Sequence, residues 1–133
     1  MSVAAAIIDD QGRALAVQRR DNSKWEPPGG VLELGETIPE GLAREVYEET
    51  GLTVEPETVT GVYKNMKHGI VAIVFRCHVT GGELRPSDET KAFAWLTPNE
   101  IPQRMTEAFA VRILDAFQPA WPHVRSHDGV NLL

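Results

Sequence analysis

The chain has 133 residues, a formal net charge of -6 at pH 7 and one cysteine, Cys77. This length fits one domain that can bury an apolar core, and the single cysteine excludes both an intramolecular disulfide and a zinc site built on paired cysteines. The negative charge argues against binding to a nucleic-acid polymer or an anionic membrane, because both attract basic surfaces.

Nothing in the sequence indicates a leader segment or a membrane span. Met1 runs directly into VAAAII, without a basic segment before it or a cleavage site after it. No apolar stretch approaches the roughly 20 residues needed to cross a bilayer. Because the lone cysteine also indicates a reducing environment, we expect a soluble, cytoplasmic protein.

Two apolar runs, VAAAIID and RALAVQRR, open the chain and are separated by Asp10, Gln11 and Gly12. The glycine-containing turn predicts a β-hairpin. Residues 25–30, WEPPGG, contain too much proline and glycine for a central strand or a helix. They predict a shaped loop.

The pattern becomes helical over residues 37–50. Apolar residues recur there at every fourth position: Ile38, Leu42 and Val46. Thr37 is expected to cap the start of the helix together with Glu40, and Gly51 is expected to end it. The apolar stripe predicts that this helix packs one face against a core.

Strands dominate the middle of the chain. Residues 59–66 and 70–79 predict long strands, because β-branched residues dominate the second run, IVAIVFRCHV. Residues 92–96 predict a further short strand, and residues 98–101 a helical turn. Residues 105–117 predict a second helix with an apolar stripe through Met105, Phe109, Ile113 and Phe117. This element order favours an α/β fold with a mixed sheet packed between helices.

The last fifteen positions, residues 119–133, show no clear periodicity. They nevertheless carry several apolar side chains, which are unusual in a freely solvated tail: Trp121, Val124, Val130, Leu132 and Leu133. We therefore expect a domain of residues 1–118 and a tail that docks on it or on the partner in a homodimer. The sequence leaves monomer and homodimer open.

Three carboxylates stand together on the first predicted helix. Glu45, Glu48 and Glu49 are spaced i, i+3 and i+4, so they project from one face. Like charges at this spacing destabilise an isolated helix by about 0.2–0.5 kcal/mol per pair. The cluster is either a solvated acidic face or a site for a hard cation such as Mg²⁺ or Mn²⁺, which prefers oxygen ligands.

The residues around this cluster favour the cation site. Residues 30–52 read GVLELGETIPEGLAREVYEETGL. This segment resembles the Nudix signature, which is Gly, five residues, Glu, seven residues, then Arg-Glu-aliphatic-x-Glu-Glu-x-Gly-aliphatic. Every fixed position of that signature is matched: Gly30, Glu36, Arg44, Glu45, Val46, Glu48, Glu49, Gly51 and Leu52. The lead-in WEPPGG and the element order support the resemblance outside the signature.

The resemblance implies an α/β/α sandwich and a hydrolase that cleaves a nucleoside diphosphate linked to another group. It implies Mg²⁺, with Mn²⁺ as the alternative, held by four groups: the carbonyl of Gly30 and the carboxylates of Glu45, Glu48 and Glu49. Glu36 and Arg44 would brace the loop against the helix. Glu45 is our assignment for the general base that removes a proton from the attacking water.

Four residues outside the signature are further candidates for the site. Glu89 precedes the strand at 92–96, where similar family members have a glutamate that adds a metal ligand or acts as the base; the alternative is an exposed turn acid. Arg19 and Arg20 are candidate phosphate contacts. Strand alternation sends them to opposite faces, and we prefer Arg20. Trp25 either stacks on a nucleobase or covers the core.

The substrate is less well determined than the chemistry. Some subfamilies carry a proline or a tyrosine marker downstream of the signature, and here that neighbourhood reads MKHGI. We therefore favour a nucleoside triphosphate pyrophosphohydrolase of the MutT type. An ADP-ribose or nucleotide-sugar pyrophosphatase is the second interpretation. A non-catalytic nucleotide-binding Nudix module is a third, and the complete set of glutamates in the signature argues against it.

Overall fold

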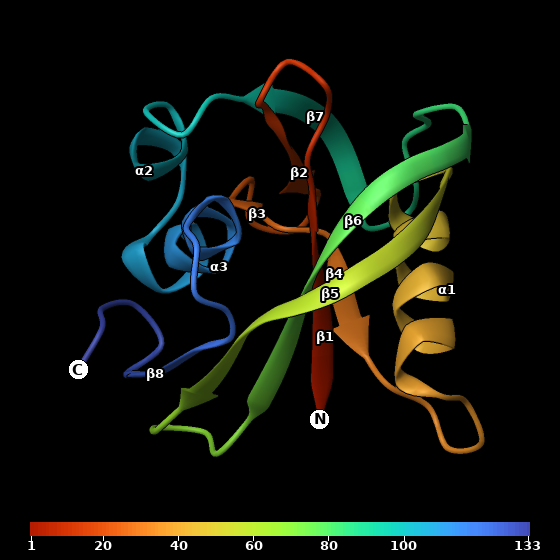
Figure 1. The fold of residues 1–133 in the computed structure, drawn as a ribbon. Helices are drawn as coiled ribbons and strands as arrows, with labels where there is room; N and C mark the ends of the chain where they lie inside the picture. Colours follow the sequence, from red (N-terminus) through yellow and green to blue (C-terminus); the bar gives the residue numbers. More distant parts are fainter.

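The computed structural model describes all 133 residues as two sheets and three helices (Figure 1). The elements in chain order are β1 (Ser2–Ile7), β2 (Ala14–Arg19), β3 (Trp25–Glu26), β4 (Gly29–Val31), α1 (Ile38–Thr50), β5 (Leu52–Asn65), β6 (Val71–Gly82), β7 (Thr90–Leu96), α2 (Ile101–Arg104), α3 (Glu107–Phe117) and β8 (His123–His127).

The larger sheet is mixed and lies between helices. Its strand order is β4-β1-β6-β5-β8, with β1 parallel to β6 and β8 parallel to β5. Helix α1 lies on one side, and α2 and α3 lie on the other (Figure 1). The predicted α/β sandwich with a mixed sheet is therefore confirmed, and a second, antiparallel sheet of order β3-β2-β7 accompanies it.

The hairpin predicted for the first two strands is wrong. β1 pairs with β4 and β6, whereas β2 pairs with β3 and β7. The two runs are connected by the bridge between Ile8 and Ala14 and by hydrogen bonds between Asp9 and Arg13 at the turn, but no extended ladder joins them. Both strands are almost entirely buried. A continuous apolar run is typical of a strand covered on both faces, and each of these strands has its own neighbours on both edges.

Helix α1 forms as its sequence predicts. Thr37 Oγ1 accepts a hydrogen bond from Glu40 N–H at 3.3 Å, and Glu40 Oε2 accepts one from Thr37 N–H at 3.3 Å. Gly51 ends the helix with a φ of 82°, a left-handed conformation that glycine adopts without steric cost. Leu42 and Val46 are fully buried. Leu42→Ala at such a site costs about 2–5 kcal/mol.

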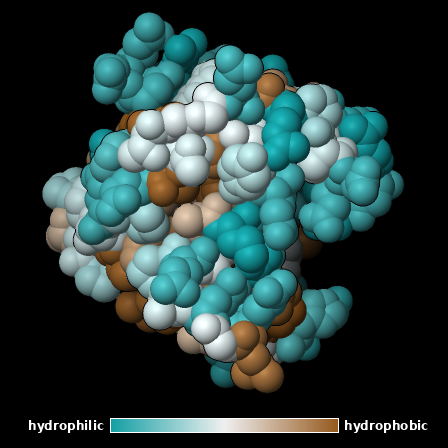
Figure 2. Space-filling view, turned by 90° about the vertical axis from the view of Figure 1, so that its right-hand side faces the viewer, coloured by the Kyte–Doolittle hydropathy of each residue, from teal (hydrophilic) through white to brown (hydrophobic).

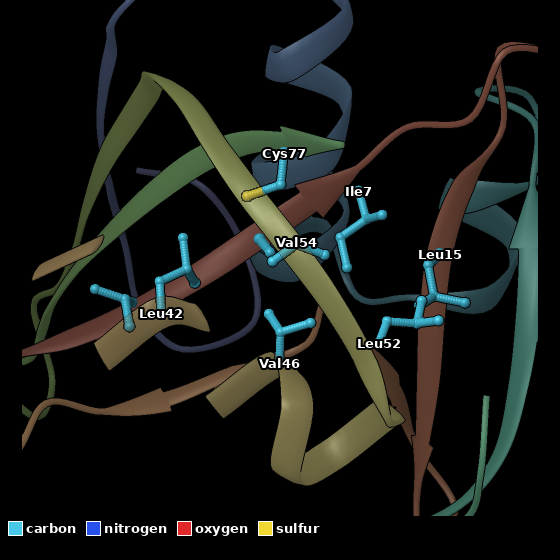
Figure 3. Packing of buried hydrophobic residues seen from close by; sticks show 9 residues of the cluster. Ile7, Leu15, Leu42, Val46, Leu52, Val54 and Cys77 are labelled. Carbon is cyan, nitrogen blue, oxygen red and sulfur yellow. The ribbon is translucent and has the colours of Figure 1, made fainter. Parts of the chain in front are cut away.

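The stripe of α1 packs into a core that joins the two sheets (Figure 3). Figure 3 shows side chains from α1, β1, β2, β5 and β6 meeting in one interior: Ile7, Leu15, Leu42, Val46, Leu52, Val54 and Cys77. Burial raises the pKa of Cys77 to about 12, so this thiol is an inert core residue. The core fixes α1 beside the junction of the two sheets, where the candidate site lies.

Several element boundaries differ from those predicted. β5 begins at Leu52, directly after α1, although the segment contains Pro56; the pairing with β6 shifts register there. β7 begins at Thr90 instead of 92. The predicted helix over 105–117 begins at Glu107, because Met105 and Thr106 have extended backbone and separate α3 from the short α2.

Residues 119–133 contain a strand that the sequence did not predict. β8 pairs with β5 over Gly61–Asn65. Asp115 on α3 accepts hydrogen bonds from Tyr63 Oη at 2.8 Å and from Arg125 Nε and Nη2 at 2.6 and 2.8 Å. Trp121 Nε1 donates to the Asp115 carbonyl at 2.7 Å. These bonds tie the segment to α3 and β5 within one chain.

None of the helices is long and apolar enough to cross a membrane.

Candidate active site

A cavity of about 490 Å³ lies where α1 meets both sheets. Twelve residues line it: Val17, Arg19, Asp21, Glu26, Gly29, Gly30, Val31, Glu45, Glu49, Asp88, Glu89 and Thr90. The lining contains six carboxylates and a single cationic side chain, so it concentrates negative charge. Figure 2 views the α1 side of the molecule and shows a mostly hydrophilic face with separate apolar patches. An anionic substrate can enter such a cavity only with additional positive charge.

Glu49 is the most deeply buried carboxylate of the cavity. It is 7% exposed, and its Oε2 accepts one long hydrogen bond, from Gly29 N–H at 3.3 Å. Burial raises the pKa of Glu49 to about 8, and the charges of Glu26, Glu45 and Glu89 act in the same direction. Without a neighbouring cation, this side chain therefore holds its proton at neutral pH.

Glu45 lies directly against Gly30. A Cβ atom at position 30 would collide with all three atoms of the Glu45 carboxylate. A side chain at position 30 would therefore displace the Glu45 carboxylate from its present place, whereas glycine leaves room for it. Burial raises the pKa of Glu45, whereas the hydrogen bond from Arg44 Nη1 to Glu45 Oε1, at 3.0 Å, opposes the rise.

Glu48 does not face the cavity. Its side chain is 59% exposed and accepts a hydrogen bond from Arg44 Nη1 at 3.2 Å. Glu48 and Glu49 are adjacent in sequence and so point about 100° apart around the helix axis. The structure therefore joins Glu45 and Glu49 across the cavity, but it does not bring the three helix carboxylates to one point.

Glu36 and Arg44 form a bidentate ion pair beside the cavity. Arg44 Nε and Nη2 donate to Glu36 Oε2 and Oε1 at 2.9 and 2.8 Å, and Glu33 N–H donates to Glu36 Oε1 at 2.7 Å. These bonds lower the pKa of Glu36 to about 2. The pair joins the loop to α1, which is the bracing geometry that the signature implies.

The candidates outside the signature separate into two groups. Glu89 and Arg19 line the cavity. Arg20, which we preferred over Arg19, lies outside it, because its guanidinium donates to the backbone carbonyls of Ser87 and Thr90 at 3.1 to 3.2 Å. The register shift between Gln18 and Arg19, at the end of β2, sets this orientation.

Trp25 also lies outside the cavity lining. Its ring packs against the core cluster between the smaller sheet and the helices α2 and α3, and Arg104 stands over it at 5.4 Å. This is the core-covering interpretation of Trp25 rather than base stacking.

Sequence reasoning missed three acids of the cavity: Asp21, Glu26 and Asp88. Glu26 lies in the WEPPGG segment, where we predicted a loop. Its backbone instead forms β3, and Glu26 is opposite Val17 of β2. Burial raises the pKa of Glu26, against the attraction of Arg19. Its position in the sequence, as a charged residue between Trp25 and two prolines, was the signal that could have identified Glu26 as a candidate site residue.

The oxygen ligands that this cavity offers are of the type that a hard divalent cation prefers. Glu26, Glu45, Glu49 and Glu89 supply carboxylate oxygens around one cavity, and the backbone of Gly30 borders it. No three of these carboxylates are close enough in this structure to surround an ion, so binding requires their side chains to rotate inward. Burial is the main cause of the raised pKa of Glu49, and the neighbouring carboxylates add to it.

The chain is similar to known proteins over most of its length. A family model described as a NUDIX domain matches residues 1–117. A MutT-like protein from Streptomyces ambofaciens is 56% identical over 133 residues, which cover 100% of this chain and 86% of the relative. An ADP-ribose pyrophosphatase from Methanocaldococcus jannaschii is 34% identical over 104 residues, 73% of this chain and 62% of the relative.

Solved structures show the same likeness. The crystal structure of an ADP-ribose pyrophosphatase from Streptococcus suis superposes with a TM-score of 0.76 at 26% identity, covering 95% of this chain and 97% of that one. The residues that the family model matches include the whole cavity lining and end before β8.

Proposed function

Because this chain belongs to the Nudix family and is a Nudix hydrolase, we propose that it is a Mg²⁺-dependent nucleoside triphosphate pyrophosphohydrolase. The products are a nucleoside monophosphate and pyrophosphate. Nudix hydrolases generally use divalent metal cations. One observation supports this proposal most directly: six carboxylates line one cavity, and the most deeply buried of them, Glu49, has its pKa raised to about 8.

With Glu45 kept as the base, the residues that would hold the cation are Glu49 and Glu89, together with the carbonyl of Gly30; Glu48 would join them after its side chain leaves Arg44. Mn²⁺ is the alternative to Mg²⁺, since both prefer oxygen donors. When bound, a divalent cation supplies positive charge to the phosphate oxygens and makes an attacking water more acidic. Removing Glu48 from the Arg44 pair has a small cost, because Glu48 is largely exposed.

The remaining roles follow from what lines the cavity. Glu45 is held against Gly30 by the fold and is our assignment for the general base. Arg19 is the cationic side chain of the lining and is our assignment for the phosphate contact, in place of Arg20.

A second candidate substrate class is ADP-ribose or a nucleotide sugar. It is supported by the ADP-ribose pyrophosphatases that resemble this chain in sequence and in structure. A relative named as a putative 8-oxo-dGTP diphosphatase, from Bacillus subtilis and 31% identical over 97 residues, supports the nucleoside triphosphate instead. The bond that is cleaved is a phosphoanhydride in both cases, so the same carboxylates serve either substrate.

A substrate panel tests the proposal. The full chain is incubated with Mg²⁺ and with nucleoside triphosphates, ADP-ribose, nucleotide sugars or dinucleoside polyphosphates, and released phosphate and pyrophosphate are quantified. We expect Mg²⁺-dependent pyrophosphate release from a triphosphate. Faster cleavage of ADP-ribose would select the second candidate. Nucleotide binding without turnover of any substrate would instead indicate a non-catalytic module.

The metal requirement tests which carboxylate is the base. A positioned base contributes about 10²–10⁴-fold, and the loss of a ligand can cost as much, so the rate alone does not separate the two roles. Glu45→Gln should lower kcat with little change in the Mg²⁺ concentration for half-maximal activity. Glu89→Gln should raise that concentration and be partly rescued by added Mg²⁺. The opposite pattern would exchange the two roles.

A further inference from the structure

The guanidinium of Arg19 is fixed along one edge by a carboxylate of the same turn. Arg19 Nε and Nη2 donate to Asp21 Oδ1 and Oδ2 at 2.9 and 2.7 Å. The turn itself is closed by two backbone bonds, from Arg19 N–H to Lys24 O at 2.9 Å and from Ser23 N–H to Arg19 O at 3.0 Å. Arg19 and Asp21 are thus held together locally, and their pairing depends little on the rest of the cavity.

The opposite edge of Arg19 is only weakly engaged. Nη1 lies 3.4 Å from Glu26 Oε1, which is beyond the usual length of such a bond. A guanidinium has five N–H donors, and these contacts use three of them. The two that remain are on Nη1 and Nη2, the edge that can bind two oxygens of one phosphate. Asp21 therefore orients the free edge of Arg19.

Other carboxylates of the cavity compete for this guanidinium. Glu26, Glu49 and Glu89 line the same cavity as Arg19. A lone arginine in such surroundings would pair with Glu26 or Glu49, because these two are less exposed than Asp21 and charge pairs are stronger where less water surrounds them. That pairing would withdraw Arg19 from a phosphate and would occupy groups needed for the cation. Arg19 has two carboxylate partners, and Asp21, whose side chain is 62% exposed, is the more exposed of them.

We propose that Asp21 is a positioning residue, which holds Arg19 at the rim of the cavity so that it contacts substrate phosphate and stays off the cation-binding carboxylates. The inference rests on the proposed function, since it takes a phosphoanhydride as the substrate. It assigns a role to a residue outside the signature. It also explains why a cavity already rich in negative charge contains a further carboxylate beside its single cation.

Asp21→Asn tests the proposal, because asparagine keeps the size of the side chain and removes the charge and one of the two acceptors. We expect KM for the substrate to rise roughly tenfold, the effect of weakening one hydrogen bond to a charged group, with a much smaller change in kcat. The Mg²⁺ concentration for half-maximal activity should rise as well, because the released Arg19 competes for the carboxylates. Affinity for inorganic pyrophosphate with Mg²⁺, measured by calorimetry, should fall by a similar factor.

Asp9→Asn provides the matched control. Asp9 also pairs with an arginine, through Arg13 Nε and Nη2 at 3.1 Å, but in a turn that does not line the cavity. It should leave KM, kcat and pyrophosphate affinity unchanged. Melting temperatures of both variants show that each is folded, and Asp21→Ser is the second variant at the site.

Two results would overturn the inference: unchanged KM and pyrophosphate affinity in both Asp21 variants, or a fall in kcat at constant KM. The pyrophosphate measurement separates this inference from the proposed function. If the wild type cleaves no substrate of the panel, the proposed function fails, yet weaker pyrophosphate binding by Asp21→Asn still supports the positioning of Arg19.

Discussion

Two buried carboxylates, one on each side of the larger sheet, have opposite surroundings. Asp115 on α3 is 3% exposed and accepts three side-chain hydrogen bonds, two of them from the guanidinium of Arg125. Glu49 on α1 is 7% exposed, accepts one bond of 3.3 Å and faces other carboxylates. A buried carboxylate that is fully paired maintains structure. One that is left unpaired among like charges needs a ligand to complete it.

The largest expected effect comes from breaking the paired site. Asp115→Ala leaves Arg125 and Tyr63 without their acceptor, and loss of one partner of a buried ion pair typically costs about 3–5 kcal/mol. We expect a loss of that order in the free energy of unfolding, measured with urea, and near-normal kcat in the protein that remains folded. Glu57→Gln is the control, because the Glu57–His78 pair is exposed and should contribute little.

Deleting residues 118–133 extends this test. The deletion removes Arg125 and Trp121 together, along with the pairing of β8 on β5. It should lower thermal stability at least as much as Asp115→Ala does. An unchanged melting temperature would mean that neither β8 nor the Asp115 network supports the fold.

Replacing the unpaired carboxylate Glu49 should have the opposite result, a loss of activity without a loss of stability. Glu49→Gln should reduce kcat/KM by at least about 100-fold, the upper end of what loss of a supporting group costs. Its stability without metal should stay level or rise, because glutamine cannot ionise and so avoids the cost of burying a carboxylate charge there. Glu48→Gln should lose less activity, since Glu48 lies outside the cavity. Wild-type turnover by Glu49→Gln at ordinary Mg²⁺ would contradict its place among the ligands.

Protein stability, measured at several pH values in the presence of a chelator, should respond to Glu49 and to the Glu36–Arg44 pair with opposite signs. The pKa of Glu49 in the folded protein is about 8, above its ordinary 4.5. Between these values the unfolded chain loses this proton while the folded chain keeps it, so Glu49 should destabilise the fold increasingly as pH rises from 4.5 to 8. Glu49→Gln should flatten that part of the stability curve.

The smallest effect is expected at Glu36. Its pKa is about 2 in the folded protein, below the ordinary 4.5, so its pairing with Arg44 stabilises the fold above pH 4.5 and ceases to do so as pH falls from 4.5 to 2. Glu36→Gln should flatten this acidic range alone, in urea titrations at several pH values. A slope that persists in this variant would assign the acid sensitivity to other groups.

The sequence predicted best what is decided locally. Thr37, Glu40 and Gly51 determine the ends of α1 through contacts within a few residues, and the structure confirms all three. Glu45 and Glu49 face the cavity because i and i+4 positions share a face. Glu48, also predicted for that face, points about 100° away from Glu49 around the helix axis and pairs with Arg44, a contact that the spacing alone does not reveal.

Long-range pairing was harder to predict. The hairpin of the first two runs failed because, beyond the turn between Asp9 and Arg13, the two strands pair with β4, β6, β3 and β7 instead of with each other. β8 was missed because four of its five residues are polar or charged. Its position depends on Asp115 and Tyr63, which are distant in the sequence. Arg19 was ranked below Arg20 for a similar reason, since the register with β7 decides which arginine reaches the cavity.

The pairing of β8 with β5 also bears on how the chain folds during synthesis. β5 ends at Asn65 and β8 begins at His123. A ribosome that adds roughly 5–20 residues per second needs roughly 3–12 s to make the residues between them. For that time β5 is an open edge strand, and such edges recruit other chains. Translation speed should therefore affect the soluble yield of this protein more than its final stability suggests.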